Sequence, residues 1–241
     1  MKFYVTGDFH GHFDNLYGRL ERIQEPHCGI IVLGDAGFNF YLNKTDRRLK
    51  DKVSEYGHTI YCVRGNHEAR PQDVANMKII YDVNVCGDVY VEEGYPLIRY
   101  FIDGGIYLIE NWKTLVIGGA YSVDKEYRLA RGWTWFANEQ LNKDERTRIF
   151  NKVKGQTFDL ILTHTCPESL QPVDLFLPMI DQSQVDKTME QFLEGIKENI
   201  DWQVWLFGHF HASRICDNGV EMFYTNIERL RTIMNRWVKA S

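Results

Sequence analysis

The amino-acid sequence predicts one domain with a mixed α/β fold. In the first half, short apolar runs alternate with segments of helical periodicity, an order typical of parallel strands joined by helices. In the second half, glycine-bearing turn signals lie between apolar runs and predict antiparallel hairpins. The 241 residues contain no proline- or serine-rich linker, internal repeat or low-complexity tract, so we expect a single domain over residues 1–241.

Each expected element follows from local composition. Runs rich in β-branched and aromatic residues predict strands, and apolar residues at three- and four-residue spacing predict helices. Asp103-Gly104-Gly105 predicts a hairpin within residues 95–110, whereas residues 124–136 are expected to be irregular. Strands are expected in residues 2–7, 29–35, 58–68, 95–110, 113–122, 158–168, 202–215 and 219–226, and helices in residues 14–24, 43–55, 138–153, 185–200 and 228–238.

Composition favours a globular protein of a reducing compartment. The formal net charge is −5, so the chain lacks the basic character of many nucleic-acid-binding proteins, and a nucleic-acid partner is possible but not favoured. The five cysteines are odd in number, widely spaced and without a CxxC pair, which argues against a disulfide framework. We therefore expect a cytoplasmic protein with neither a signal peptide nor a membrane-spanning segment.

Chemically active side chains follow five of the predicted strands at the point where each apolar run stops. Ligand sites in open α/β sheets lie beyond the carboxyl ends of strands, so we expect these side chains to converge although they are scattered along the chain. They are Asp8, His10, Asp35, Asn66, His67, His164, His209 and His211.

A cluster of carboxylates, imidazoles and an amide indicates a metal centre, because without cations it would be poorly satisfied. Nitrogen and oxygen ligands without a thiolate suit Mn, Fe, Zn or Ni and select poorly among them, so we expect two divalent or trivalent ions. Asp35 stands alone at its strand end and is our candidate for a bridging carboxylate. Taken singly, each residue is more often a turn or cap residue, and only membership of the set favours a ligand role.

The order of these motifs resembles that of the calcineurin-like metallophosphoesterases. GDFHG and RGNHE are similar to the serine/threonine phosphoprotein phosphatase branch, whereas GHFH is more similar to the broader phosphoesterase and nuclease branches. The resemblance implies a layered α-β-β-α sandwich of two mixed β-sheets flanked by helices. The motifs are Asp8-x-His10, Gly34-Asp35, Gly65-Asn66-His67-Glu68, His164 and Gly208-His209-x-His211.

The same resemblance implies a role for each residue. His67 would bind no metal and would act beside the leaving group as a general acid or phosphate donor. A hydroxide shared by the two ions, which lower the pKa of water, would attack phosphorus. One metal would take Asp8, His10, Asp35 and His211, and the other would take Asp35, Asn66, His164 and His209.

The chain departs from the phosphoprotein phosphatase pattern just after Asp35. Phe38 stands where that branch has an acid that orients the catalytic histidine, and Asn39 stands where it has a phosphate-binding arginine. We expect Asn39 to donate to a phosphate oxygen, and Arg64 or Arg128 to supply the missing guanidinium. The segment 121–136, which contains Arg128, resembles one in small bacterial and phage phosphoesterases and is expected to fold over the metals.

The favoured function is hydrolysis of phosphomonoesters by a dinuclear metal-dependent phosphatase. A phosphodiesterase or a nuclease of the same chemistry is the alternative, and a nuclease would need a basic groove. An alternative of another class is a metal-free protein-binding scaffold on the same fold, which would be expected to lose ligands that are all present here. The basic run in residues 44–52 is interpreted as a solvated helix face.

Overall fold

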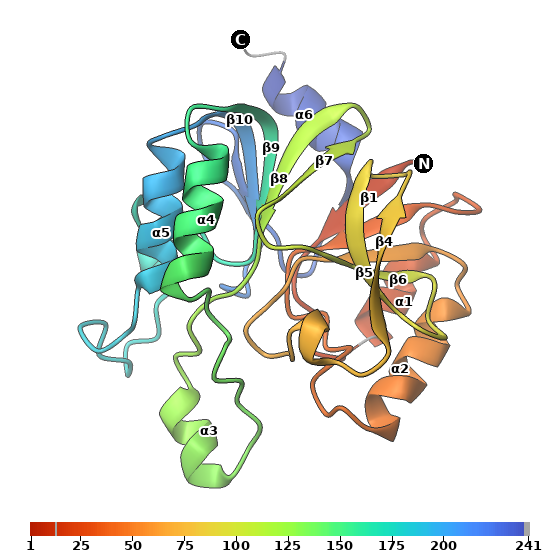
Figure 1. Ribbon diagram of the computed structural model, residues 1–241, viewed down its shortest axis with the longest axis horizontal. Helices are drawn as coiled ribbons and strands as arrows, with labels where there is room; N and C mark the ends of the chain where they lie inside the picture. The colour runs from red at the N-terminus through yellow and green to blue at the C-terminus, as the bar shows by residue number, and fades with distance from the viewer. Residues whose placement is uncertain (13, 239–241) are drawn as a thin grey trace.

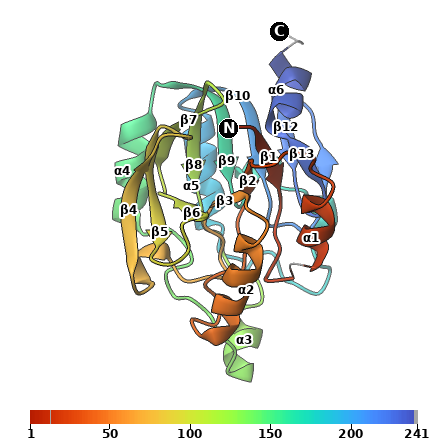
Figure 2. The ribbon, with the colours of Figure 1, turned by 90° about the vertical axis from the view of Figure 1, so that its right-hand side faces the viewer.

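The computed structural model describes residues 1–12 and 14–238 and has two β-sheets packed face to face, with helices on the outer faces (Figures 1 and 2). Within those residues, one sheet has seven strands in the order β13-β1-β2-β3-β6-β5-β4, and the other has six in the order β11-β12-β10-β9-β8-β7. The layered sandwich of two mixed sheets is therefore confirmed.

The seven-stranded sheet is parallel at its centre and antiparallel at its edges. Its parallel strands are β1 (Phe3–Thr6), β2 (Gly29–Val32), β3 (Thr59–Cys62) and β6 (Ile98–Phe101), and its antiparallel ones are β13 (Ile227–Arg229), β5 (Gly87–Glu92) and β4 (Met77–Asp82). Helices α1 (Asp14–Leu20) and α2 (Lys44–Ser54) connect the first three strands, as the alternating pattern predicts.

The six-stranded sheet also has a parallel centre, so the prediction of an antiparallel second half was wrong there. Helices α4 (Lys143–Val153) and α5 (Thr188–Lys197) are crossover connections, and a crossover returns the next strand parallel to the last. The parallel strands are β8 (Trp112–Ile117), β9 (Thr157–Thr163), β10 (Asp201–Phe207) and β12 (Val220–Met222), and the antiparallel edges are β7 (Gly105–Ile109) and β11 (Arg214–Ile215).

The predicted hairpin at Asp103-Gly104-Gly105 was also wrong. The strand before this turn, β6, pairs with β3 and β5 in one sheet, whereas the strand after it, β7, pairs with β8 in the other. The turn therefore carries the chain from sheet to sheet. Asp103 holds the crossing in place, because its carboxylate accepts hydrogen bonds from the Gly118 amide at 2.7 Å and from Arg64 at 2.7 Å.

Apolar side chains fill three layers. The central layer lies between the sheets, where Val5 and Ile31 of one sheet meet Leu160 and Leu206 of the other, and α6 (Leu230–Val238) contributes to it. The outer layers lie under α1 and α2 on one face and under α4 and α5 on the other. Full burial of one such side chain is worth about 1.5–3 kcal/mol. Because both sheets share the central layer, we propose that residues 1–241 form a single domain. Residues 13 and 239–241 lie outside the described part.

Most predicted helices form, with shifted ends. α1 stops at Leu20, four residues before the expected end, whereas α2 starts after an Asn43 cap that accepts from the Thr45 amide at 2.8 Å. The segment 124–136 is not wholly irregular, because α3 (Lys125–Arg131) forms within it and projects away from both sheets (Figure 1). Short 3₁₀ turns are η1 (Pro71–Asp73), η2 (Glu168–Leu170) and η3 (Val173–Leu175). None of the helices in the described residues has the length and apolar character needed to cross a membrane.

Candidate functional site

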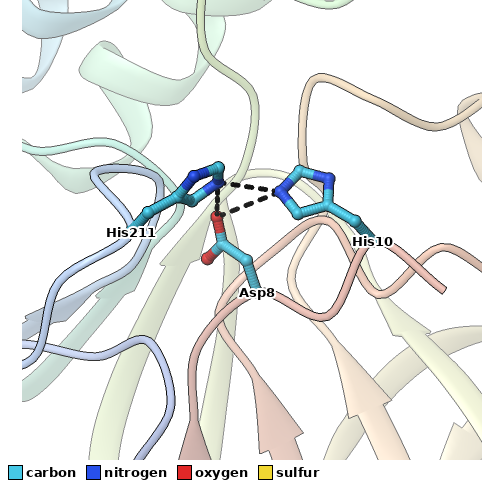
Figure 3. A group of neighbouring side chains, drawn as sticks. All are labelled: Asp8, His10 and His211. Atoms are coloured by element: carbon cyan, nitrogen blue, oxygen red, sulfur yellow. Dashed lines mark hydrogen bonds and ion pairs between the residues drawn. The ribbon is translucent and has the colours of Figure 1, made fainter. Parts of the chain in front are cut away.

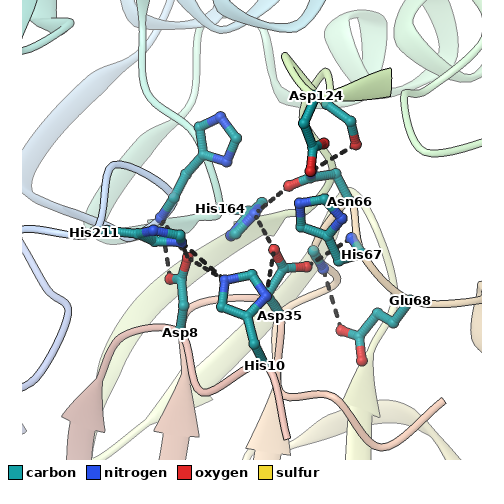
Figure 4. A network of polar contacts seen from close by, with 12 residues as sticks. Asp8, His10, Asp35, Asn66, His67, Glu68, Asp124, His164 and His211 are labelled. Carbon is teal, nitrogen blue, oxygen red and sulfur yellow. Dashed lines mark hydrogen bonds and ion pairs between the residues drawn. The ribbon is translucent and has the colours of Figure 1, made fainter. Parts of the chain in front are cut away.

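The predicted residues meet at one edge of the sandwich, beyond the carboxyl ends of β1, β2 and β3 in one sheet and of β9 and β10 in the other (Figure 4). Three of them, Asp8, Asp35 and His164, are buried to at least 97 %. Parallel strands from two facing sheets end side by side here, which explains how residues 8 and 211 come into contact. The convergence predicted from the strand ends is therefore present in the geometry.

Asp8, His10 and His211 form the first group of facing donor atoms (Figure 3). Nε2 of His10 lies 2.8 Å from Nε2 of His211. An oxygen of Asp8 lies 3.6 Å from the His211 nitrogen and 3.9 Å from the His10 nitrogen. Their donor atoms all lie within 4.8 Å of one another, close enough for one cation to bind all three.

Asp8, Asp35 and His164 form the second group. Nε2 of His164 lies 2.8 Å from Oδ1 of Asn66 and 3.5 Å from Oδ2 of Asp35. The other ring nitrogen, Nδ1, donates to the Leu33 carbonyl at 2.8 Å, which fixes the ring and directs Nε2 into the site. Asp35 also lies 3.8 Å from the His10 ring, so its carboxylate sits between the two groups.

The ionisation of this cluster fits a cation-binding site. Burial and then His10 lower the pKa of His211 to about 4, and burial lowers that of His209 well below its usual value, so both imidazoles keep free lone pairs. Burial would lower the pKa of His164, but Asp35 and Asp8 outweigh it and raise that pKa to about 9. In the absence of a metal, a proton on His164 thus supplies the positive charge that the carboxylates require. Metal binding would release that proton, as it does wherever ligands must be deprotonated.

The pKa values of the two buried carboxylates, Asp8 and Asp35, are shifted in opposite directions. Burial raises the pKa of Asp8 to about 7. Burial also favours neutral Asp35, but His164, His67 and His10 outweigh it and hold the pKa of Asp35 well below its usual value. Two buried carboxylates with neutral imidazoles and an amide are a donor set for divalent cations, which supports the metal-site prediction.

Four of the clustered residues have a left-handed backbone conformation. The φ angles are 46° at His10, 47° at Asp35, 68° at His209 and 51° at His211. Such angles are uncommon outside glycine and cost of order 1–3 kcal/mol each, so the surrounding fold must hold them in place. Strain of this kind concentrates at functional sites, and no pattern in the sequence indicated it.

Two glycines let the carboxylates lie against the backbone. A Cβ atom on Gly65 would stand 1.9 Å from an Asp35 oxygen, and one on Gly208 would stand 2.3 Å from an Asp8 oxygen. The same close approach allows the His67 amide to donate to Asp35 at 2.8 Å and the His209 amide to donate to Asp8 at 3.0 Å. The glycines that precede Asn66 and His209 in the motifs therefore leave room for the carboxylates of Asp35 and Asp8 to pack against the backbone.

A buried relay orients Asn66. Its Nδ2 donates to Oγ of Ser122 at 2.8 Å, and that hydroxyl donates to Oε2 of Glu139 at 2.5 Å. Glu139 also accepts from the Ser122 amide at 3.1 Å and from the Trp135 indole at 2.9 Å. The relay fixes which way the Asn66 amide points, with Oδ1 toward His164. Sequence reasoning missed Ser122 and Glu139, because no motif or spacing links them to Asn66.

Replacing Glu139 with glutamine is expected to weaken metal binding by about 10–100-fold, the usual cost of losing a partner that orients a ligand. Glu139 accepts three hydrogen bonds with its two oxygens, and a glutamine would turn a donor toward one of them. Competition for Mn²⁺ against a chelator measures the change. Glu198→Gln, at an exposed position after α5, is the matched control. Equal affinity in both variants would contradict the relay.

His67 lies between two pockets and lines both. Its ring is half-buried, and its centroid is 5.3 Å from that of His10. Burial lowers the pKa of His67, while Asp35 and Asp124 act in the opposite direction. Arg128 of α3 lines the first pocket with His67, and its Nε donates to Asp124 at 2.7 Å. The α3 segment thus brings an acid and a cation to the side of His67, as expected for Arg128.

The structure places Arg64 and Asn39 away from both pockets, so their predicted contact with substrate is corrected. Arg64 is 4 % exposed and donates to Asp103 at 2.7 Å, to the Glu139 carbonyl at 2.6 Å and to the Gly118 carbonyl at 3.2 Å. Asn39 is 1 % exposed, and its Oδ1 accepts from Lys50 at 2.7 Å. Nearness in sequence to a motif does not decide which way a side chain points, and here both side chains point into the interior.

Two basic residues of α2 line the site but were not among the residues predicted from the sequence. Arg48 and Lys52 line the first pocket, of about 520 Å³, together with His12 and Arg128. Their spacing of four residues places both on one face of the helix. That spacing was the available signal. The interpretation of residues 44–52 as a solvated face agrees with the exposure of Arg48 and Lys52 but was wrong for Lys50, which is buried and donates to Asn39. The pocket therefore offers an anion several positive charges beside the metal cluster.

Comparison with known proteins agrees with the geometry. The sequence profile of the calcineurin-like phosphoesterases matches residues 1–213. No curated protein matches the chain. One solved crystal structure matches with a TM-score of 0.53 and 12 % identity over 96 % of this chain and 95 % of its own. This likeness concerns the fold alone.

Two further solved structures are more distant. The protein TT1561 of Thermus thermophilus has a TM-score of 0.49 and 12 % identity, covering 96 % of this chain and 95 % of its own. The phosphopantetheinyl hydrolase PptH of Mycobacterium tuberculosis has a TM-score of 0.41 and 15 % identity, covering 93 % and 90 %. The profile match spans most of the chain and every strand-end motif, so the chain belongs to the calcineurin-like phosphoesterase family and is a metal-dependent hydrolase of phosphate-ester bonds.

Proposed function

We propose that the protein is a phosphatase that hydrolyses a phosphomonoester at a centre of two metal ions. The observation that carries the proposal is the pair of donor groups, which share Asp8, while Asp35 of the second group also lies 3.8 Å from His10 of the first. Two bound cations would supply polarisation of a phosphoryl oxygen and acidification of a water molecule at neutral pH. We propose Mn, Fe, Zn or Ni as the ions, since the donors are nitrogen and oxygen.

The ligands divide as their contacts suggest. One ion would be held by Asp8, His10, Asp35 and His211, and the other by Asp35, Asn66, His164 and His209. Asp35 is the shared ligand because it lies near His10 on one side and His164 on the other. With two carboxylates against two divalent cations, the ligand set stays net positive and attracts phosphate even on an acidic chain.

We assign proton donation to His67. It lies beside the proposed metal ligands without belonging to either donor group, and it faces both pockets. From there its imidazolium can transfer a proton to the departing alcohol oxygen, which would otherwise leave as an alkoxide. Phe38 is buried in the core and cannot orient it, so we propose Asp124 for that role, because its charge raises the pKa of His67.

The activity is tested by removing and restoring metal. Chelation should abolish hydrolysis of p-nitrophenyl phosphate, and Mn²⁺ should restore it, because every ligand side chain remains in place. The monoester should be hydrolysed with a higher kcat/KM than bis(p-nitrophenyl) phosphate. Failure to hydrolyse any ester with any of the four metals would refute the proposal.

A phosphodiesterase is the second candidate, and one observation favours it. Two pockets adjoin the proposed metal site, both lined by Asp35 and His67, and a diester has two groups to place. We favour the monoester because the first pocket carries Arg48, Lys52 and Arg128, which suit an anion better than an alcohol. A higher kcat/KM for the bis-ester would reverse this order.

Replacing Arg128 with alanine is expected to lower kcat/KM by about 10–100-fold, mainly through KM. A charge-assisted hydrogen bond to phosphate is worth about 1.5–3 kcal/mol, and each ~1.4 kcal/mol is tenfold. Steady-state kinetics measure the change. Arg131→Ala, one turn away, is the control, because that guanidinium lies 5.1 Å from the Tyr127 ring and lines neither pocket. Equal kinetics in the two variants would remove Arg128 from the site.

A further inference from the structure

The second pocket, of about 360 Å³, shares Asp35 and His67 with the first, basic pocket. Three other residues of the cluster, Asn66, His209 and His211, also line it. Its walls come from the segment before α3, the loop between β9 and α5, the first turn of α5 and the loop after β10. A volume near the lower end of the usual ~300–1,000 Å³ range suits one small-molecule group rather than a macromolecule.

The walls are largely apolar and aromatic. Phe176 and Phe210 lie with their rings 18° from parallel and centroids 6.3 Å apart, and Tyr121 also lines the pocket. Leu175 and Leu177 line it and keep 36 % and 53 % of their surface exposed. Apolar side chains that remain open to water beside a reactive centre gain stability when an apolar group covers them. The wall composition therefore favours an aromatic occupant.

Polar side chains also line the pocket, and two of the carboxylates, Asp124 and Glu190, have a buried oxygen without a hydrogen-bond partner among the described residues. Glu190, in the first turn of α5, lines the pocket and is only 4 % exposed. Its Oε1 accepts from the Thr165 hydroxyl at 2.7 Å, whereas its Oε2 is buried with no hydrogen-bond partner among the described residues. Such an unsatisfied acceptor is costly and calls for a partner, which a donor on a bound ligand would provide.

We propose that this pocket binds the alcohol part of the phosphate ester, and that this part is a heteroaromatic group with an N–H donor that Glu190 accepts, the chemistry of a nucleobase. The inference rests on the proposed function, since the phosphoryl group would lie at the metal cluster with its leaving group toward the pocket. His67 borders both regions and would stand where the scissile oxygen departs. Glu190 is then a specificity residue, remote from the reacting atoms.

Binding of the alcohol part alone tests the inference without any catalysis. Calorimetric titration with nucleosides, which lack phosphate, should show saturable binding by those whose base presents an N–H donor. Glu190→Gln should weaken this binding at least ~10-fold. The variant loses the charge-assisted hydrogen bond between the carboxylate and the ligand, and the amide group of glutamine would place a donor opposite the N–H donor of the ligand. Leu177→Gln should weaken it too, whereas Met179→Gln should not, because Met179 is exposed in the same loop but does not line the pocket.

Kinetics separate failure of the inference from failure of the proposed function. p-Nitrophenyl phosphate has an aromatic group without an N–H donor, so Glu190→Gln should lower its hydrolysis much less than that of a nucleoside monophosphate. The same variant should lose at least ~10-fold in kcat/KM on a nucleoside monophosphate. Absence of nucleoside binding, or equal binding and turnover by Glu190→Gln, would overturn the inference while ester hydrolysis stands. If the unaltered protein hydrolysed no ester at all, the proposed function would be wrong instead. Nucleoside titration would still test whether the pocket binds a base.

Discussion

Replacing Asp35 with asparagine is expected to lower kcat on p-nitrophenyl phosphate by about 10³-fold, because several kcal/mol of metal-derived stabilisation would be lost at ~1.4 kcal/mol per tenfold. The substitution removes one charge and one of two anionic oxygens, while the asparagine oxygen can still accept the hydrogen bond from the His67 amide. Asp35 lies 3.8 Å from His10 and 3.5 Å from His164, so an imidazole of each donor group loses a nearby anion.

Metal content and melting temperature distinguish this effect from misfolding. The variant should bind less Mn²⁺ per chain by elemental analysis, and added Mn²⁺ should raise its melting temperature less than that of the unaltered protein, since a ligand stabilises only the state that binds it. Asp88→Asn is the matched control, because Asp88 is exposed on β5, away from the site. Full metal content together with full activity in Asp35→Asn would remove this carboxylate from the centre.

The alternating pattern of the first half predicted β1, β2 and β3 as parallel neighbours because helical segments join these short apolar runs. The same reasoning missed the parallel centre of the second sheet. The glycine turn at residues 103–105 suggested a hairpin, but a turn signal says only that the chain turns. Which strand comes next in a sheet depends on long-range pairing, and that put β6 and β7 in different sheets.

The convergence of the candidate metal ligands was predictable because they share one rule, a position just after a strand. Asp8, His10, Asp35, Asn66, His164, His209 and His211 all follow it, and parallel strands bring such positions together. Ser122, Glu139 and Glu190 follow no such rule. They act through buried hydrogen bonds to residues elsewhere in the chain, and such bonds depend on how helices and loops pack over the sheet edge.

Arg64 illustrates the limit of arguing from motif proximity. It directly precedes Gly65-Asn66-His67, and a guanidinium there suits phosphate, yet its donors bind Asp103 and two backbone carbonyls in the interior. Arg128 lies far from any motif but reaches the first pocket through the projecting α3 segment. The direction of a side chain on a loop is set by its burial, which a single sequence does not encode locally.

Replacing His67 with glutamine is expected to lower kcat by ~10²–10⁴-fold for esters of ordinary alcohols, the usual contribution of a general acid. Glutamine keeps a polar side chain near Asp35 and Arg128 but has no proton to transfer. The loss should depend on the leaving group, because a p-nitrophenolate departs without protonation whereas an alkoxide does not. Hydrolysis of p-nitrophenyl phosphate should therefore fall much less than hydrolysis of an alkyl phosphate.

This leaving-group dependence separates proton donation from phosphate binding. If His67 only held the phosphoryl oxygens, the two esters would lose activity equally, since both present the same phosphoryl group; equal losses would contradict the acid role. His12→Gln is the control, because His12 lines the same basic pocket but does not line the second pocket, where the leaving group is expected. A selective loss in His67→Gln alone would place the departing oxygen between the two pockets, where His67 borders both.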